Sequence, residues 1–118
     1  MTALAITLSA LLILACVVGS IADFRHNESI VATMARFGLP HNFEVVAGVV
    51  KLAAGGGLAV GFADHSARGF LTTLVAACLV AYFAIASSFH VRAGDAPRDT
   101  APAVALCAVS LALAFAAV

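Results

Sequence analysis

Charged residues are scarce in this sequence of 118 residues, making up 10% of it against about 25% in soluble domains. Tryptophan is absent, and no run of basic residues occurs. So few charges argue against a soluble protein, because polar side chains could not cover its surface. The lack of a basic run, with a formal net charge of zero, removes the electrostatic footprint of a nucleic-acid-binding protein.

Cysteine and histidine are also few, and neither forms a recognisable site. The three cysteines lie within apolar stretches without a CxxC spacing, so we expect them to be small packing residues: Cys16, Cys78 and Cys107. The histidines show no HxxxH or Cys/His spacing, so we expect no metal site from them: His26, His41, His65 and His90.

Apolar residues dominate instead, at 64% of the chain, with a mean hydropathy of +1.12. They form four segments, residues 4–22, 45–62, 70–89 and 101–118. A helix rising about 1.5 Å per residue could cross a hydrocarbon core about 30 Å thick with each of them. No Lys or Arg precedes the first segment, so we expect a span rather than a signal peptide. The sequence predicts an all-α membrane protein, a single domain over 1–118 with an antiparallel bundle of four transmembrane helices.

The connection between spans one and two, residues 23–44, has a helical pattern of its own. Apolar residues recur at helical spacing: Ile30, Val31, Met34 and Phe37. Asn27 is suited to cap this helix, and Gly38 followed by Pro40 to end it. We expect a short interfacial helix over 28–37, followed by Asn42 as the cap of span two.

Arginines indicate the orientation in the membrane. The side that holds the first and third connections contains Arg25, Arg36, Arg92 and Arg98, whereas the side that holds both termini contains Arg68. The positive-inside rule then predicts that both termini lie outside, and we expect a bacterial cell membrane.

Lys51 is the one charged residue in the span 45–62. A lysine at the centre of a span costs about 2.5–3.5 kcal/mol on insertion scales, so it needs a partner or a route to water. Alternating spans place Asp23, Tyr82 and His90 toward the same membrane face. Two interpretations stay open: an Asp23–Lys51 ion pair that sets helix register, and a ligand pocket made of Lys51, Tyr82 and His90.

Span two is also rich in glycine. Gly57 and Gly61 form a small-xxx-small pattern, and Gly48 lies earlier in the same span. Such residues let helices approach closely, so we expect helix packing at Gly48, Gly57 and Gly61.

Four short segments together resemble the DoxX-like family of small four-span membrane proteins. They are residues 19–23, 36–40, 45–52 and 86–95, in the same order and spacing as in the family. Family members typically carry a lysine near the end of span one and a glutamate in span two. This chain has Asp23 and Lys51 there, with the signs exchanged, as an ion pair would require.

The resemblance implies roles in redox complexes or in receptor assembly, which leaves two main hypotheses. In the first, the protein is a non-catalytic subunit or assembly factor that lies in the lipid bilayer and binds another membrane protein or a second copy of itself. In the second, it is a quinone- or lipid-binding subunit of a redox system, with quinone as the possible cofactor. A small multidrug-type transporter is disfavoured, because residues 4–22 contain no carboxylate.

Overall fold

The computed structural model describes residues 2–64 and 66–117, and each element within them is a helix. These helices are α1 (Ala3–Phe24), α2 (Glu28–Arg36), α3 (Phe43–Ala63), α4 (Arg68–Arg92) and α5 (Pro97–Ala116). Four of them, all except α2, are long and apolar enough to cross a membrane. The all-α prediction is therefore confirmed, together with the short helix between spans one and two.

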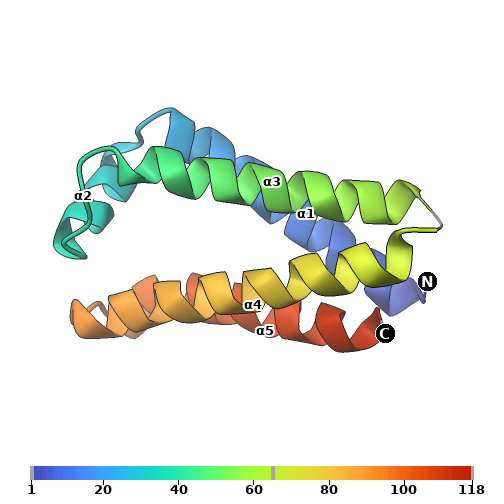
Figure 1. The fold of residues 1–118 in the computed structure, drawn as a ribbon. Helices are drawn as coiled ribbons and strands as arrows, with labels where there is room; N and C mark the ends of the chain where they lie inside the picture. The colour runs from blue at the N-terminus through green and yellow to red at the C-terminus, as the bar shows by residue number, and fades with distance from the viewer. Residues whose placement is uncertain (1, 65, 118) are drawn as a thin grey trace.

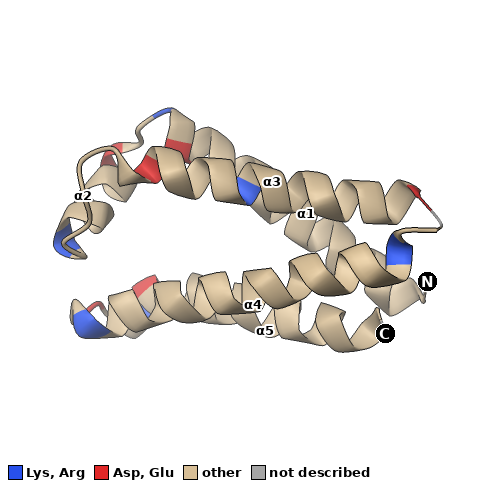
Figure 2. Ribbon diagram, viewed as in Figure 1, with Lys and Arg blue, Asp and Glu red and all other residues tan. Residues whose placement is uncertain are grey.

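The four long helices form two pairs. α1 packs along α3, and α4 packs along α5, while α3 against α4 and α1 against α5 join the pairs less extensively. The pairs approach each other near the two termini and diverge toward α2 (Figure 1). We call these the narrow end and the wide end of a molecule that measures 41 × 25 × 17 Å. Charged residues gather mainly at the wide end (Figure 2).

The ends of α2 follow the predicted local chemistry. The side chain of Asn27 accepts a hydrogen bond of 2.9 Å from the backbone N–H of Ser29, as an N-cap does. Gly38 adopts a φ of +74°, and the N–H of Leu39 bonds to the carbonyl of Met34 at 3.2 Å. This left-handed glycine satisfies the last carbonyls of the helix and turns the chain toward α3.

One predicted capping bond and one predicted helix start need correction. Asn42 occupies the N-cap position of α3 but makes no side-chain capping bond, because its backbone has a left-handed φ of +62°. The last span begins at Pro97 rather than near Ala101. Pro97 suits the first helical position, where its missing N–H would have no helical partner, and Pro102 is then accommodated inside the helix.

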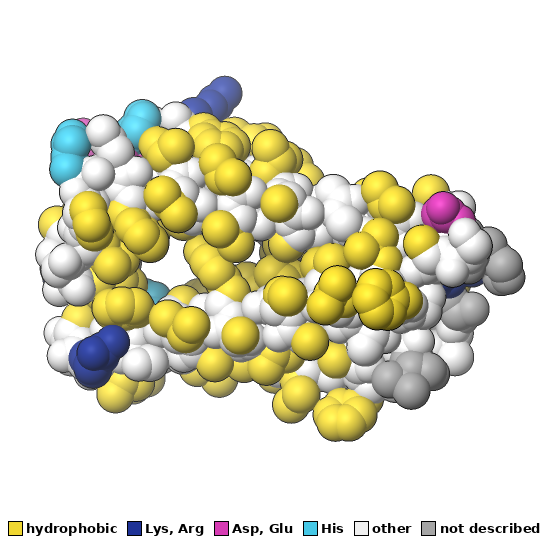
Figure 3. All heavy atoms as spheres, in the orientation of Figure 1, with side chains coloured by type: hydrophobic (Ala, Val, Ile, Leu, Met, Phe, Trp, Pro, Cys, Tyr) yellow, Lys and Arg dark blue, Asp and Glu magenta, His cyan; other side chains and the backbone are white. Residues whose placement is uncertain are grey.

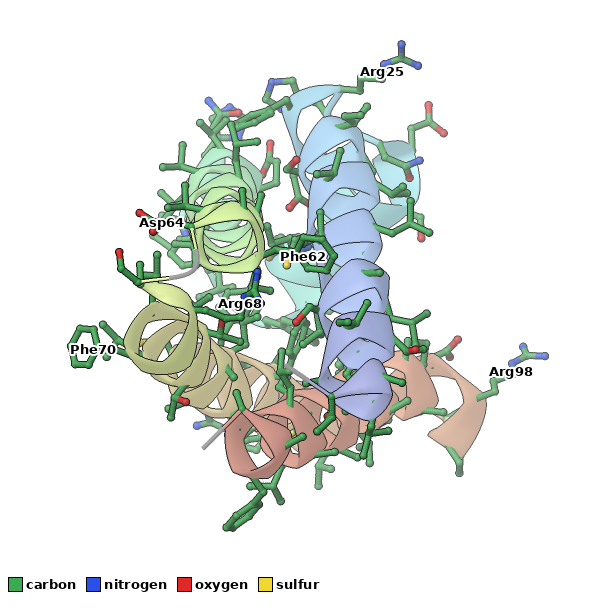
Figure 4. All side chains as sticks on the ribbon, turned by 90° about the vertical axis from the view of Figure 1, so that its right-hand side faces the viewer. Arg25, Phe62, Asp64, Arg68, Phe70 and Arg98 are labelled. Carbon is green, nitrogen blue, oxygen red and sulfur yellow. The ribbon has the colours of Figure 1, made fainter. Side chains whose placement is uncertain are left out.

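The bundle interior is small and its outer surface is apolar. Each span contributes one leucine that is at most 1% exposed: Leu12, Leu58, Leu79 and Leu113. Large apolar residues cover the outside instead (Figure 3), and Phe70, 78% exposed, points away from the bundle (Figure 4). The three cysteines are free. This inside-out distribution is what a lipid-facing surface requires.

Glycines of α3 allow close approach at the narrow end. A Cβ on Gly61 would lie 2.6 Å from Thr72 Oγ1 and 3.4 Å from its backbone nitrogen, and one on Gly57 would lie 2.9 Å from Val75 Cγ2. Gly56, on the outer face of the same helix, has open space around its missing Cβ. Gly57 and Gly61 therefore contact α4, while Gly48 faces Phe24 of α1.

We predict that Gly61→Ala destabilises the bundle by about 1–3 kcal/mol, because its methyl group overpacks the contact with Thr72. Gly56→Ala is the matched control, which adds the same methyl group in open space and should be neutral or stabilising. Unfolding in mixed micelles with increasing SDS measures both. Equal stability of the two variants would contradict the close contact between α3 and α4.

Candidate functional site

An apolar cavity of about 260 Å³ lies at the wide end between α2, α3 and α4. In Figure 3 the surface is hollowed between α3 and α4, where the two helix pairs diverge. The lining side chains are apolar except for one tyrosine: Met34, Phe37, Leu39, Phe43, Val46, Ala47, Val50, Tyr82, Ile85, Ala86 and Phe89.

Helical periodicity explains why these residues share one cavity. The α3 residues have the spacing i, i+3, i+4, i+7, as do the α4 residues, so each set occupies one face of its helix. From α2 and the turn after it, Met34 and Phe37 cover the end of the cavity, so part of the predicted apolar face of this helix contacts protein. Val46, Val50 and Ile85 are 50%, 40% and 58% exposed, so the cavity opens toward lipid between α3 and α4.

Tyr82 supplies the polar group of the cavity. Its ring packs edge-on against Phe83, with centroids 5.2 Å apart and an interplanar angle of 88°. In the part of the chain that the structure describes, its hydroxyl has no hydrogen-bond partner. Tyr82 is thus the one lining residue with a polar side-chain group, and a few placed polar groups in an apolar wall are typical of ligand sites.

Lys51 contacts α1 rather than the cavity. Its Nζ donates a hydrogen bond of 3.0 Å to Asp23 Oδ2, and the two side chains are 19% and 1% exposed. The lysine stem passes over Gly19, where an added Cβ would lie 3.2 Å from Lys51 Cδ. The second carboxylate oxygen of Asp23 is buried without a partner among the described residues. The pair is therefore largely shielded, and it joins α1 to α3.

A second charged group, the Asp95 cluster, joins α2 to α4 and to the loop after it. We use this name for Arg36, Phe37, Phe89, His90 and Asp95. Nη2 of Arg36 donates to both oxygens of Asp95 at 3.0 Å, and His90 Nδ1 lies 2.6 Å from Asp95 Oδ2. Phe37 stacks on Phe89 at 5.4 Å between centroids and meets His90 edge-on at 4.9 Å.

The pKa of Asp95 reflects these partners. The hydrogen bond from His90 lowers this pKa most, followed by the hydrogen bond from Arg36. The carboxylate thus stays ionised and holds the side chains of Arg36 and His90 at the rim of the cavity.

His26 and Glu44 form a third contact at the wide end. Nδ1 of His26 lies 2.7 Å from Glu44 Oε1, and the glutamate side chain is 4% exposed. This contact attaches the turn after α1 to the first turn of α3. Sequence reasoning did not identify this contact, because eighteen positions separate the two residues.

The structure separates the three residues of the predicted pocket. Tyr82 lines the cavity, Lys51 pairs with Asp23, and His90 belongs to the Asp95 cluster. Sequence reasoning missed the phenylalanines of the cavity and the Arg36–Asp95 contact. His65 lies outside the described residues, and within residues 2–64 and 66–117 no group of three potential metal ligands gathers.

A comparison with protein families agrees with this architecture. The model described as "DoxX-like family" matches residues 7–113, which include all of α2, α3 and α4 and most of α1 and α5. No curated protein and no solved structure matches the chain.

We predict that Lys51→Met destabilises the protein by about 3 kcal/mol, because it leaves Asp23 buried without a counter-charge. The exchange Asp23→Lys with Lys51→Glu should recover most of this loss by restoring a pair of opposite sign. Thermal unfolding in detergent measures the variants. A double variant no more stable than Lys51→Met would show that the positions do not interact.

A second prediction concerns the stability of the protein at low pH. In the folded protein the pKa of Asp95 lies below its ordinary 3.8, so its stabilisation is complete above that value and is lost as pH falls through the lowered pKa. We expect the melting temperature of Asp95→Asn to lie a few degrees below wild type at about pH 5 and the difference to shrink by about pH 3. Glu28→Gln, an exposed change in α2, is the control. A difference that grew toward pH 3 would contradict the lowered pKa.

Proposed function

The chain belongs to the DoxX-like family of multi-pass membrane proteins, and from this membership we propose a non-catalytic subunit of a membrane complex that binds a quinone or a lipid. The observation that carries the proposal is the cavity of about 260 Å³ between α2, α3 and α4. Ligand sites are mostly apolar with a few placed polar groups, and this cavity has that character. Its volume lies just below the range of about 300–1,000 Å³ for drug-sized ligands, so it suits one ring or part of one chain.

The chemistry of the wall supports a ligand that comes from the membrane. The cavity opens between α3 and α4, where Val50 and Ile85 are 40% and 58% exposed on the lipid-facing side. The free hydroxyl of Tyr82 would donate to a carbonyl oxygen of a quinone or of a lipid ester. The rings of Phe37 and Phe89 offer apolar surface at the end of the cavity near α2.

A non-catalytic role fits the state of the ionisable groups. Asp23 is held by Lys51, Glu44 by His26, and Asp95 by Arg36 and His90. Each of these groups is engaged in holding two helices together. The cavity itself contains a single hydroxyl and no acid–base pair among its lining residues, so binding is better supported than chemistry.

Membership of a complex and the orientation are parts of the same proposal. The spans bury only 17–28% of their most apolar windows within the bundle, so their outer faces are available to a neighbouring membrane protein. Arg25, Arg36, Arg92 and Arg98 belong to α2 or to the turns and helix ends at the wide end, which favours termini outside a bacterial cell. Labelling of a cysteine placed at Ser66 from the outer side measures this orientation.

We predict that filling the cavity weakens ligand binding. Ala86→Phe would place a ring in the cavity, whereas Ala84→Phe adds the same ring to the exposed face of α4. Photolabelling in nanodiscs with short-chain quinone and acyl-chain diazirines should mark the cavity faces of α3 and α4. Labelling should fall about tenfold in Ala86→Phe, since the ring clashes with the ligand, and should be unchanged in Ala84→Phe.

Two results would contradict the proposal. Labelling that survives Ala86→Phe would show that neither ligand class occupies the cavity. A protein that purifies in mild detergent as a monodisperse species without a stoichiometric partner would count against the complex.

Tyr82→Phe keeps the ring and removes the hydroxyl, and should weaken quinone or lipid labelling about three- to tenfold, the effect of one hydrogen bond.

A further inference from the structure

We propose that the ligand is an anionic phospholipid, with its phosphate between Arg36 and Arg92 and one acyl chain in the cavity. The inference rests on the proposed function and adds to it a second, polar compartment. That compartment is a hollow of about 170 Å³ lined by Arg36, Phe37, Phe89, Arg92 and Ala93. Phe37 and Phe89 also line the apolar cavity, so the two compartments share these walls.

The two guanidinium groups retain donors for a phosphate. Arg36 uses only Nη2 to bind Asp95, which leaves Nη1 and Nε without partners among the described residues, and its side chain is 48% exposed. Arg92 lies over the ring of Phe89, with Cζ 4.8 Å from the centroid. In the described part of the chain, no carboxylate forms an ion pair with Arg92.

The charge at this site matches one anionic headgroup. Two arginines against the single carboxylate of Asp95 leave one positive charge. Arginine presents planar donors that match phosphate oxygens, and its weaker hydration suits a site beside aromatic rings. Basic pockets between spans are typical binding sites of anionic lipid headgroups. A quinone has no anionic group and would leave this charge unused.

The order of the two compartments matches the order of groups in a phospholipid. Arg92 is the last residue of the span α4, and Arg36 ends the short helix α2 beside the same end of α4, so both lie at the level of the headgroup region. The cavity extends from Phe89 to Tyr82 along α4, about two helical turns deeper into the membrane. A phosphate at the arginines would therefore place its acyl chain beside Tyr82.

The phenylalanine stack fixes α2 beside α4. Phe37 and Phe89 lie 5.4 Å apart with 21° between their planes, and the Arg36–Asp95 bonds hold α2 beside α4. The arginines are thus supplied by two elements that the Asp95 cluster already holds together. Binding would need little rearrangement of the backbone.

The test uses phosphatidylglycerol and phosphatidylcholine that carry a diazirine in one acyl chain, added to the full-length protein in detergent. Native mass spectrometry measures binding, and crosslinking measures where the chain lies. Arg92→Gln should weaken phosphatidylglycerol binding about tenfold, the effect of one charge-assisted contact, and affect phosphatidylcholine less. Arg98→Gln removes an exposed arginine that points away from the bundle (Figure 4) and should change neither lipid.

Each of the other possible outcomes would overturn a defined part of the proposal. Equal phosphatidylglycerol binding by wild type and Arg92→Gln overturns the headgroup site. The proposed function still stands in that case if Ala86→Phe blocks labelling by the acyl chain. Weakened binding in Arg92→Gln with chain labelling unchanged in Ala86→Phe overturns the placement of the acyl chain in the cavity. Equal loss in Arg98→Gln would show non-specific attraction to the basic end and would also overturn the site.

Discussion

The ion pair between Asp23 and Lys51 is the interaction on which the arrangement at the wide end depends. A charge at the depth of Lys51 is tolerated only beside a counter-charge or water, so their 3.0 Å contact sets the register of α1 against α3. Gly19 gives the lysine stem its path across α1. With this register, the turn after α1 meets the start of α3 through His26 and Glu44, and the chain enters α2 beside the cavity.

Side-chain size along α3 and α4 explains why the helix pairs diverge. At the narrow end, Gly57 and Gly61 allow α4 to approach until Val75 and Thr72 touch the α3 backbone region. Toward the wide end, branched and aromatic side chains replace the glycines on the facing surfaces, and the helices separate. The cavity is therefore a consequence of a gradient in residue volume along α3 and α4.

Much of this fold was predictable, because membrane-spanning segments are set by length and hydropathy alone. The lysine could be matched with Asp23 from its depth and from the exchange of signs relative to the DoxX-like family. The Arg36–Asp95 contact was not predictable, since the two residues are separated by 59 positions and both are ordinary loop or helix-end charges. Helix starts such as Pro97 were missed because hydropathy reports where the apolar stretch begins, and the helix continues into polar residues.

The cavity escaped prediction for a related reason. Its walls are built from phenylalanines, valines and alanines that look like any lipid-facing residues until the angle between α3 and α4 is known. Tyr82 was identified as a candidate from its depth, but its assignment to a pocket with Lys51 assumed that both side chains share one interhelical space. The lysine instead lies between α1 and α3.

At each end of the molecule a different force holds the helices together, and the two forces respond to different surroundings. The narrow end depends on close packing between glycines and small side chains, which dissolved ions do not reach. The wide end is held by Arg36 and Asp95, an ion pair with a half-exposed guanidinium, whose strength falls as salt shortens the Debye length to about 8 Å at physiological ionic strength. Salt at the wide end therefore weakens the ion pair that attaches α2 beside α4, and leaves the close packing at the narrow end unchanged.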